Sequence, residues 1–470
     1  MIRKLISIWS AAFFLLAPLG AQLSSGLTVS EEEKLSRSIL GYIYRHYEII
    51  DDPIIVDYVN QVGNRIVSVL EDPIFDYKFH VIKVDTFNAF AIPAGYIFMN
   101  SGLIAAMDSE DELAGILAHE IAHVNARHIS QKIERSKKVG WATIAGVAAG
   151  VLIGMAGGAE AGQAVTQGSQ AAGAAAELSY SRDNEIQADQ LGLIYLNDAG
   201  YDGAGLLKIL KKMRRKQWFS TEQIPTYMRT HPAIDERITY LDSQLASSPK
   251  DNPMQPRADA GDFARVHTYL ITRYGDEKLV LKYLETQVKQ RPEDPMAHHR
   301  YGLILARVNR RAEAIEHLRT ALQKRAFDPY MLRDVGRVYY LDGQFEQSLK
   351  MLKTAHNKIP DDADCGLYLG QTYMAMGQYD EASSVLRGVV EKHRGYTKAY
   401  YILGQSLGKQ GNLADAHYYL GIYHTRKRDL KTALVQYRRA LKYTKDAERR
   451  ATIEKRIKKF EEILAKQRKG

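Results

Sequence analysis

A His-Glu-x-x-His motif, formed by His119, Glu120 and His123, contains side chains that can bind a metal ion or transfer a proton. Residues 111–118 before the motif have apolar side chains at helical spacing, so we expect the motif on a helix. Side chains four positions apart lie on one face of a helix, so both histidines can bind one zinc ion while the glutamate acts as general base. The motif predicts a zinc hydrolase site, although the same pattern also arises by chance in long chains.

A catalytic zinc needs a third protein ligand and one open position for water. Glu185 is the best candidate, because it lies on a predicted helix that ends near Gly200. Asp189 follows one turn later on the same face, where its carboxylate can accept a hydrogen bond from the free ring N–H of a ligating histidine. The alternative is that both acids are ordinary solvent-facing charges.

The elements that must position these residues alternate between helical and strand patterns from about residue 30 to 135. Ser30 and the three glutamates after it are typical of a helix start. Strands are predicted at Phe79–Val84 and at Gly95–Asn100. Before both strands, a helix is predicted from apolar residues at helical spacing, namely Val56, Val59, Val62, Ile66 and Val69.

Composition limits the class of protein. The chain has 470 residues, enough for two domains, and its 45% hydrophobic and 25% charged residues are typical of a soluble globular protein. Cys365 is the single cysteine, so no intramolecular disulfide can form. We interpret the net charge of +9 as a solvated basic surface and expect no nucleic-acid partner, because no aromatic and basic nucleic-acid motif is present.

The N-terminus has the features of an export signal. Arg3 and Lys4 precede the apolar run Leu5–Leu19, which is too short to span a bilayer. We expect a signal peptide over residues 1–21, cleaved after the small residues at its end. An uncleaved anchor is the alternative.

The segment Val139–Ala159 has no charged residue and consists mainly of glycine, alanine and aliphatic residues. Its length would just span a membrane, but its glycine and alanine content makes transfer into lipid marginal. Three interpretations stay open: a mobile or packed helical hairpin over the active site, peripheral membrane contact, and a membrane span.

From about Phe263 onward the sequence repeats every 34 residues (336−302, 370−336, 404−370), which is the tetratricopeptide period. Small residues are needed where the paired helices approach closely. A degenerate repeat is expected over Arg265–Pro292, the spacing falls to 17 at Gly421 and Ala433, and a charged helix over Asp446–Lys466 is expected to cap the array. The recurring residues are Gly302, Gly336, Gly370 and Gly404 in the first helix and Ala314, Ser348, Ala382 and Ala416 in the second.

Several motifs, taken in order, resemble the gluzincin family of CAAX prenyl proteases and HtpX-like peptidases, and most closely its periplasmic members with a tetratricopeptide tail. The resemblance covers almost the entire chain. Ile92 and Ala94 depart from the family, which often has leucine and glycine there. The motifs are Asn88-Ala89-Phe90-Ala91-Ile92-Pro93-Ala94-Gly95-Tyr96-Ile97-Phe98, Gly102-Leu103, the His119 motif, Glu185 with Asp189, and Thr230-His231-Pro232 with Arg237-Ile238.

The resemblance implies that Glu185 is the third zinc ligand and that residues 88–98 form a strand edge beside the zinc. A peptide substrate would add to that edge through backbone hydrogen bonds. From the residues alone, the segment is interpreted only as a strand with a bend at Pro93–Gly95. The residues of the implied substrate edge are Asn88, Ala89, Phe90, Ala91, Pro93 and Gly95.

His231 has two interpretations. In one, it begins a helix before Pro232, and Arg237 pairs with a structural carboxylate. In the other, His231 lies near the metal and either donates to the tetrahedral oxyanion or binds zinc as a fourth ligand, while Arg237 orients the groups behind the ligands. A fourth ligand would take the position that water needs, so the enzyme would stay inhibited until the loop moved.

Together these patterns predict a mainly α protein of the α+β class. We expect a helical zinc metallopeptidase domain with a small edge β-sheet at 22–255, containing a Gly/Ala-rich segment at 139–176, and an all-α tetratricopeptide solenoid with a capping helix at 256–470. The expected function is a periplasmic endopeptidase with one zinc per chain. The resemblance implies misfolded or stalled envelope proteins as substrates and the outer-membrane assembly machinery of a Gram-negative bacterium as partner of the repeats. The alternative is a repeat scaffold or chaperone whose peptidase domain is vestigial or latched.

Overall fold

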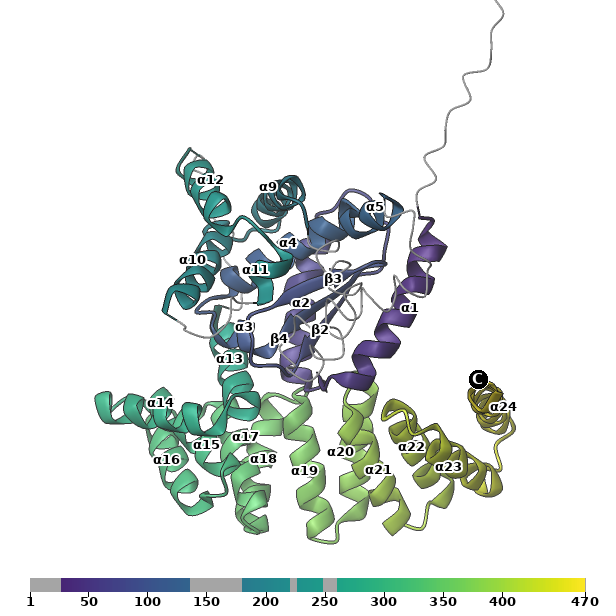
Figure 1. The fold of residues 1–470 in the computed structure, drawn as a ribbon. Coiled ribbons are helices and arrows are strands. Elements are labelled where there is room, and N and C mark those ends of the chain that lie inside the picture. Colours follow the sequence, from purple (N-terminus) through teal and green to yellow (C-terminus); the bar gives the residue numbers. More distant parts are fainter. Residues whose placement is uncertain (1–26, 136–179, 220–225, 248–259, 470) are drawn as a thin grey trace, which may run out of the picture.

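The computed structural model describes residues 27–135, 180–219, 226–247 and 260–469. A small sheet enclosed by helices is followed by an arc of helix pairs (Figure 1), which confirms the predicted fold class. The predicted signal peptide, the Gly/Ala-rich segment and the boundary at 255 lie outside the described residues, and the predicted domain limits stay predictions. Among the described helices, none combines the length and the apolar character that a bilayer crossing requires.

The first part of the chain contains a four-stranded mixed sheet with the order β1-β2-β4-β3. Strands β2 and β4 are parallel, and the two outer pairs are antiparallel. The elements are α1 (Val29–His46), β1 (Ile49–Ile50), α2 (Pro53–Val67), β2 (Lys78–Ile82), β3 (Ala89–Ile92), β4 (Tyr96–Asn100), α3 (Ser101–Ala105), α4 (Glu110–Asn125), α5 (His128–Arg135), α9 (Arg182–Asp198), α10 (Ala204–Phe219), α11 (Thr226–Thr230) and α12 (Ile234–Ser247).

The observed bounds correct several sequence expectations. Helix α1 begins before Ser30, because Thr28 caps it in a capping box with Glu31. Helix α2 ends at Val67, so the prediction that Val69 continues its apolar face is wrong. Strand β2 covers residues 78–82 rather than 79–84, and β4 begins at residue 96 rather than 95.

Strands β3 and β4 form a tight hairpin at the edge of the sheet. Ile92 pairs with Tyr96, and the turn residues Ala94 and Gly95 have φ of 62° and 82°. The loop has three residues, Pro93, Ala94 and Gly95, and positive φ at the last two turns the chain back along β3. Glycine suits this conformation, whereas alanine costs roughly 1–2 kcal/mol there. The predicted bend at Pro93–Gly95 is therefore present, and β3 is a terminal strand of the described sheet.

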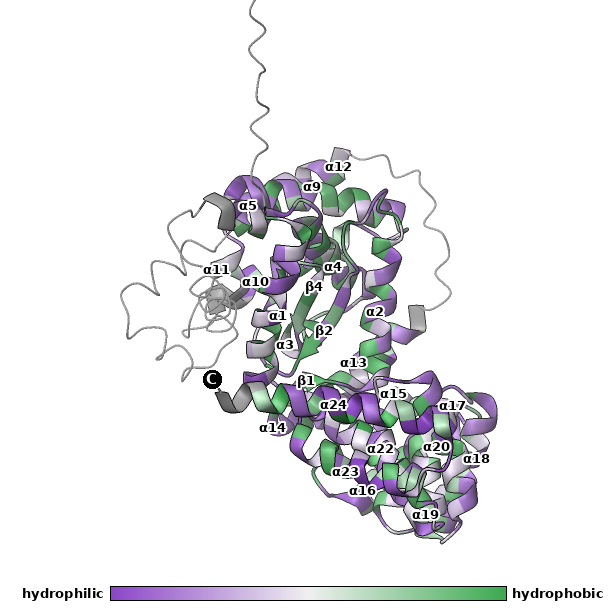
Figure 2. Ribbon diagram, turned by 90° about the vertical axis from the view of Figure 1, so that its right-hand side faces the viewer, coloured by the Kyte–Doolittle hydropathy of each residue, from purple (hydrophilic) through white to green (hydrophobic). Residues whose placement is uncertain are grey.

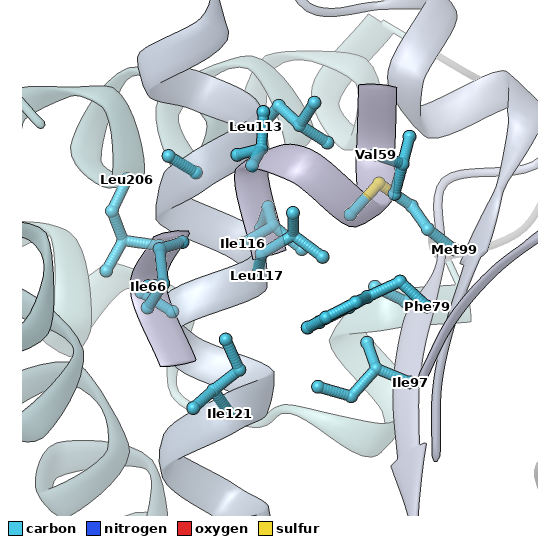
Figure 3. Close-up of a cluster of buried hydrophobic side chains, with 14 of the residues drawn as sticks. Val59, Ile66, Phe79, Ile97, Met99, Leu113, Ile116, Leu117, Ile121 and Leu206 are labelled. Atoms are coloured by element: carbon cyan, nitrogen blue, oxygen red, sulfur yellow. The ribbon is translucent and has the colours of Figure 1, made fainter. Parts of the chain in front are cut away.

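The sheet has a hydrophobic core on each face. On one face, side chains of α2 and α4 pack against the strands, as Figure 3 shows for Val59, Leu113, Leu117, Phe79 and Ile97. On the other face, α1 packs against residues of β2, β3 and β4. The resulting three layers place α4, which carries the His-Glu-x-x-His motif, in the most buried part of this region.

The second part of the chain is an array of helix pairs. Gly336 allows the close approach that its period predicts, because a Cβ there would lie 2.6 Å from Leu352 Cγ of the paired helix. Figure 2 shows hydrophilic residues along the terminal helix, α24. The helices are α13 (Ala260–Tyr274), α14 (Glu277–Gln290), α15 (Pro295–Arg307), α16 (Arg311–Lys324), α17 (Pro329–Leu341), α18 (Phe345–Lys358), α19 (Ala363–Ala375), α20 (Tyr379–Lys392), α21 (Thr397–Lys409), α22 (Leu413–Arg426), α23 (Leu430–Tyr443) and α24 (Ala447–Lys469).

Helix α13 joins the two parts. Phe263, Val266 and Leu270 belong to the core beneath the sheet, whereas Tyr269 belongs to the core of the first repeats. One helix therefore contributes to both cores, which fixes the repeats against the sheet region.

Candidate metal centre

Helices α4 and α9 bring the predicted ligands together. Ser109 caps α4 by accepting a hydrogen bond from the backbone N–H of Glu112, and Ser181 caps α9 in a capping box with Asn184. The two helices pack closely, because a Cβ on Gly192 of α9 would lie 3.4 Å from the backbone nitrogen of His119. This contact places the first half of α9 beside the motif on α4.

One ligand atom from each of His119, His123, Glu185 and His231 lies within 4.8 Å of the others. The two motif histidines have their Nε2 atoms 3.0 Å apart. Glu185 oxygens lie 3.5 Å from His119 Nε2 and 3.4 Å from His123 Nε2. All four side chains are at most 1% exposed. The structure therefore gathers residues separated by more than one hundred positions into one buried cluster.

His231 reaches this cluster from the segment between α11 and α12. Its Nδ1 lies 3.1 Å from Glu185 Oε1 and 3.3 Å from His119 Nε2. The backbone N–H of His231 donates to Tyr227 O at 2.8 Å, and the Tyr227 ring stacks on the imidazole with centroids 4.2 Å apart. Helix α12 begins three residues later, at Ile234.

Asp189 and Arg237 form an ionic layer behind the ligands. Asp189 Oδ1 lies 2.8 Å from His119 Nδ1, and Arg237 donates two hydrogen bonds to Asp189, at 2.8 and 2.7 Å. Arg237 Nη1 also lies 2.6 Å from Glu185 Oε2. Burial raises the pKa of Asp189, but the charges of Arg237 and His119 outweigh it and lower that pKa to about 2. The ionised carboxylate accepts the Nδ1–H of His119 and leaves the Nε2 lone pair facing the cluster.

Glu120 lies beside the cluster in a different environment. Its side chain is fully buried, and neither carboxylate oxygen has a hydrogen-bond partner among the described residues. His231 Nε2 approaches Glu120 Oε1 to 3.5 Å. Burial raises the pKa of Glu120. A buried carboxylate with free lone pairs is suited to accept a proton from a reacting group.

The donor set fits a zinc ion. Imidazole nitrogens and a carboxylate oxygen are common zinc donors, and tetrahedral ligands at about 2.0–2.2 Å from the metal stand roughly 3.3 Å from each other. The two Nε2 atoms are 3.0 Å apart, and Glu185 Oε1 lies 3.4 Å from His123 and Oε2 3.5 Å from His119, spacings that are close to this value. The two Nε2 atoms and the Glu185 carboxylate converge on one another, and a cation between them would bind all three.

His128 is part of the site and was not predicted from the sequence. His128 Nε2 lies 2.9 Å from Gln187 Oε1, and its Nδ1 lies 2.9 Å from His123 Nδ1. If Gln187 accepts from His128 Nε2–H, then His128 Nδ1 accepts from His123 Nδ1–H. His123 Nε2 is then also a free lone pair. The position five residues after the motif was the available signal, but its partner is a histidine rather than the usual carboxylate.

Two tyrosines enclose the imidazoles and were also not predicted. Tyr180 stacks on His123 with centroids 3.7 Å apart, and Tyr227 stacks on His231 as described above. Both hydroxyl groups lack a hydrogen-bond partner among the described residues. No periodicity or motif in the sequence indicates either tyrosine, because their role arises from tertiary packing.

The predicted substrate edge lies in β3 and the residues around it. Ala89, Phe90 and Ala91 are in β3, and Pro93 and Gly95 are in the turn that follows. Every residue of β3 is at most 1% exposed. Asn88, just before the strand, is fully buried, and its side-chain amide has no hydrogen-bond partner among the described residues. Addition of a peptide strand therefore requires a change that uncovers this edge.

Comparison with known proteins agrees with both parts of the architecture. Residues 56–245 match the model of peptidase family M48, and residues 339–406 match a tetratricopeptide repeat model. The chain contains a peptidase family M48 domain followed by tetratricopeptide repeats. The M48 match includes all the residues of the metal cluster and of the ionic layer behind it.

Named relatives match about half of the chain. A putative beta-barrel assembly-enhancing protease of Vibrio cholerae is 31% identical over 48% of this chain and 46% of its own length. The beta-barrel assembly-enhancing protease of Yersinia pestis is 27% identical over 56% of this chain and 53% of its own length. The mitochondrial metalloendopeptidase OMA1 of Schizosaccharomyces pombe is 28% identical over 40% of this chain and 52% of its own length. The matches span about half the length of these relatives.

Among solved structures, the crystal structure of MamA is 18% identical and covers 37% of this chain and 98% of its own. The TM-score is 0.30, too low to support a structural comparison.

Proposed function

We propose that the M48 domain is a zinc-dependent endopeptidase in which His119, His123 and Glu185 hold the metal and Glu120 is the general base. The observation that carries this proposal is the convergence of the ligand atoms within 4.8 Å of each other, next to a buried carboxylate without a hydrogen-bond partner. When bound, zinc supplies a Lewis acid that polarises the scissile carbonyl and acidifies a water molecule.

The protein side chains transfer the proton, orient the ligands and bind the substrate. Glu120 accepts the proton of the attacking water on a carboxylate oxygen and then delivers it to the nitrogen of the leaving amine. Asp189 and Arg237 keep His119 in the tautomer that offers Nε2 to the metal. The edge of β3 pairs with the substrate backbone, and the amide of Asn88 supplies a donor and an acceptor next to that edge.

Glu120→Gln tests the assignment of the base. The substitution keeps the shape of the side chain and removes its capacity to take a proton. We expect about one zinc per chain to remain bound and peptide cleavage to fall roughly a hundred- to ten-thousandfold. Metal analysis and a general peptidase assay measure both, with Glu236→Gln, an exposed glutamate of α12, as control. Retained cleavage would exclude Glu120 as the base.

Glu185→Ala tests the third ligand, and its expected result is loss of zinc as well as loss of cleavage. The matched control is Asp183→Asn, which changes an exposed acid in the first turn of the same helix. A Glu185→Ala protein that still binds one zinc per chain with the affinity of the unchanged protein would contradict the proposed ligand set.

We propose that His231 blocks the position that the attacking water needs. Its Nδ1 lies 3.1 Å from Glu185 Oε1, and the whole cluster is buried, which supports a latched state. His231→Ala is expected to increase cleavage while zinc stays bound. A loss of cleavage would instead indicate that His231 donates to the oxyanion.

We further propose that the chain is exported to the periplasm of a Gram-negative bacterium and acts in quality control and assembly of outer-membrane proteins. The names of the bacterial relatives support assembly as the process. The repeats offer a surface for partner proteins, and misfolded or stalled envelope proteins are the proposed substrates. Peripheral membrane contact is part of this proposal.

Burial of the site favours a second candidate function, a scaffold or chaperone whose peptidase domain is latched. His119, Glu120 and Glu185 are each 0% exposed, so this conformation does not admit a substrate. In cells that lack the protein, rescue of envelope assembly by Glu120→Gln would favour the scaffold, and failure of that variant to rescue would favour proteolysis.

A further inference from the structure

The net positive charge of the chain is concentrated in its last two helices, α23 and α24. Residues 430–470 contain fourteen lysines and arginines and five acidic residues, a net charge of +9. The whole chain has 64 basic and 55 acidic residues, so residues 1–429 contain fifty of each and are neutral overall. The excess is therefore gathered at the end of the helix array, where Figure 1 shows α23 and α24.

Helix α23 presents its basic residues to solvent. Its buried side consists of Ala433, Tyr437 and Ala440, which belong to the last hydrophobic core of the array. Because a helix has 3.6 residues per turn, Lys431 and Lys442 lie on the opposite side, three turns apart, and both are exposed. The packing of α23 thus directs its positive charge away from the array.

Helix α24 has the same arrangement. Ile453 and Phe460 are buried in the core that α24 shares with α23. Lys455, Lys458 and Lys459 are exposed on the opposite side of the helix. The acidic residue among them, Glu462, offsets one of the three charges, and a net positive surface remains.

Most of these cations have no acidic partner. Arg438 pairs with Glu461 at 2.6 Å, which joins the exposed sides of the two helices, and Arg449 pairs with Asp415 at 2.6 Å. The other exposed basic residues of this region form no ion pair with any residue that the structure describes, and all but one are lysines. We call them the C-terminal basic face: Lys431, Arg439, Lys442, Lys445, Lys455, Lys458 and Lys459.

The composition of the C-terminal basic face favours a lipid surface over a protein ligand. Lysine is a compact charge on a flexible stem and lacks the planar fork with which arginine recognises one particular carboxylate. Several lysines together are instead attracted to many dispersed charges, such as the headgroups of an anionic bilayer.

Exposed apolar side chains accompany these lysines. Val435 and Tyr443 of α23 are 46% and 42% exposed, and Lys442 Nζ lies 5.8 Å from the centroid of the Tyr443 ring. A tyrosine has an apolar ring and a polar hydroxyl group, which suits it to the boundary between lipid and water. The face therefore offers both charge and apolar contact to a membrane surface.

We propose that the C-terminal basic face docks the protein on a bilayer that contains anionic phospholipids. This inference names a surface for the peripheral membrane contact of the proposed function and rests on that function only for the compartment. It is independent of the zinc chemistry, because α23 and α24 contribute no residue to the metal centre. Since α13 fixes the repeats against the M48 domain, docking would hold the metal centre near the membrane.

The test is co-sedimentation of residues 22–470, the chain after the predicted signal peptide, with sucrose-loaded vesicles. One set of vesicles is phosphatidylcholine, and the other also contains phosphatidylglycerol. We expect at least about tenfold tighter binding to the anionic vesicles. This binding should be lost at about 0.5 M salt, where the screening length is roughly 4 Å. Equal affinity for both sets, or binding that salt leaves unchanged, would overturn the proposal.

An acidic protein is the competing partner, and soluble poly-glutamate is its probe. We expect poly-glutamate to displace the protein from anionic vesicles only at a large excess of charge. Tight binding of poly-glutamate without any binding of the anionic vesicles would show that the face recognises an acidic protein, and the proposal would be wrong.

Substitutions locate the contact. Replacing Lys455, Lys458 and Lys459 together by glutamine removes three cations from α24, and binding to anionic vesicles should weaken at least about tenfold. Lys431→Gln combined with Lys442→Gln, on α23, should weaken it at least about threefold. A thermal melt checks the folding of both variants, and the second keeps the test valid if the first unfolds.

The matched control replaces three exposed lysines of α18, Lys350, Lys353 and Lys358, by glutamine. It makes the same change in net charge and should leave vesicle binding unchanged. Cleavage of a soluble peptide should be equal in all three variants, so failure of the zinc proposal would not alter the binding result. Unchanged binding in both basic-face variants, or equal weakening in the control, would refute the docking surface.

Discussion

The M48 domain and the repeats both use glycine to bring helices together, but the neighbours of the glycines differ. A Cβ on Gly205 of α10 would lie 2.1 Å from the backbone oxygen of Asp111, beside the first turn of α4. In the repeats, a Cβ on Gly370 would instead meet the side chain of Leu386, at 2.6 Å. A side chain can change rotamer, whereas a backbone atom moves only with its helix. At Gly205 the position of α4 is therefore fixed by backbone contact, whereas at Gly370 the paired helices are in contact through a side chain that can adjust.

The two regions also differ in the range of their contacts. The metal centre joins α4, α9 and the segment before α12, with His119 and His231 112 positions apart. Each repeat packs mainly against the next along the chain, so its stability is nearly a sum of neighbouring terms. The M48 domain should consequently unfold as one unit, while the array can lose its terminal helices alone.

Arg273→Gln is the strongest test of whether the two regions are stable separately. Arg273 pairs with Asp52, the residue that caps α2, and with Asp364 of α19. Its removal leaves two buried carboxylates without their cation, which should cost about 3–5 kcal/mol. We expect calorimetry to show a lowered transition that splits in two.

The control for this prediction is Arg319→Gln, which removes an exposed arginine from α16. A single transition within about 0.5 kcal/mol of the unchanged protein would show that the two regions are joined by apolar packing of α13 rather than by the ion pairs.

Gly205→Ala and Gly370→Ala compare the two kinds of close approach directly. The first forces α10 away from α4 and should cost about 1–3 kcal/mol. The second needs only a shift of Leu386, and the higher helix propensity of alanine offsets part of the cost, so its net effect should stay below about 1 kcal/mol. Urea unfolding measures both, and zinc content should fall in the first variant alone. An equal cost would contradict the difference between the regions.

The repeats were largely predictable from the sequence, because each helix pair makes the same local contacts. Small residues recur every 34 positions, starting from Gly302 and Ala314. Gly302 packs against the paired helix, at Leu318 and Ala314. The change to a spacing of 17 also has a structural reason. Gly421 lies in α22 against Tyr437 of α23, so α22 is the second helix of one pair and the first helix of the next.

The metal centre was only partly predictable. Spacing on a helix paired His119 with His123, and a carboxylate one turn before Asp189 indicated Glu185. His128 had only its position after the motif as a local signal and Tyr180 had none, because both contacts depend on how α5 and α9 pack around α4. The tertiary fold, rather than a motif, decides which side chain stands behind each ligand.

The smallest expected effect concerns a surface contact between the two regions. His393, after α20, lies 3.1 Å from Asp57 of α2. The hydrogen bond to Asp57 raises the pKa of His393 above its ordinary value of 6.5, against the opposing effect of burial. The contribution of this contact to stability is thus complete below about pH 6.5 and is lost as the pH rises through the folded-state pKa.

His393→Gln should therefore destabilise the protein at about pH 6 by roughly 0.5 kcal/mol and have little effect near pH 9. Because Asp57 is mostly exposed, solvent screening keeps the effect small. Asp57→Asn should give the same pH dependence, and the double variant should lose no more than either single one. A destabilisation that is equal at both pH values would mean that His393 acts through packing, and the charged contact between α2 and the repeats would then contribute nothing to holding the two regions together.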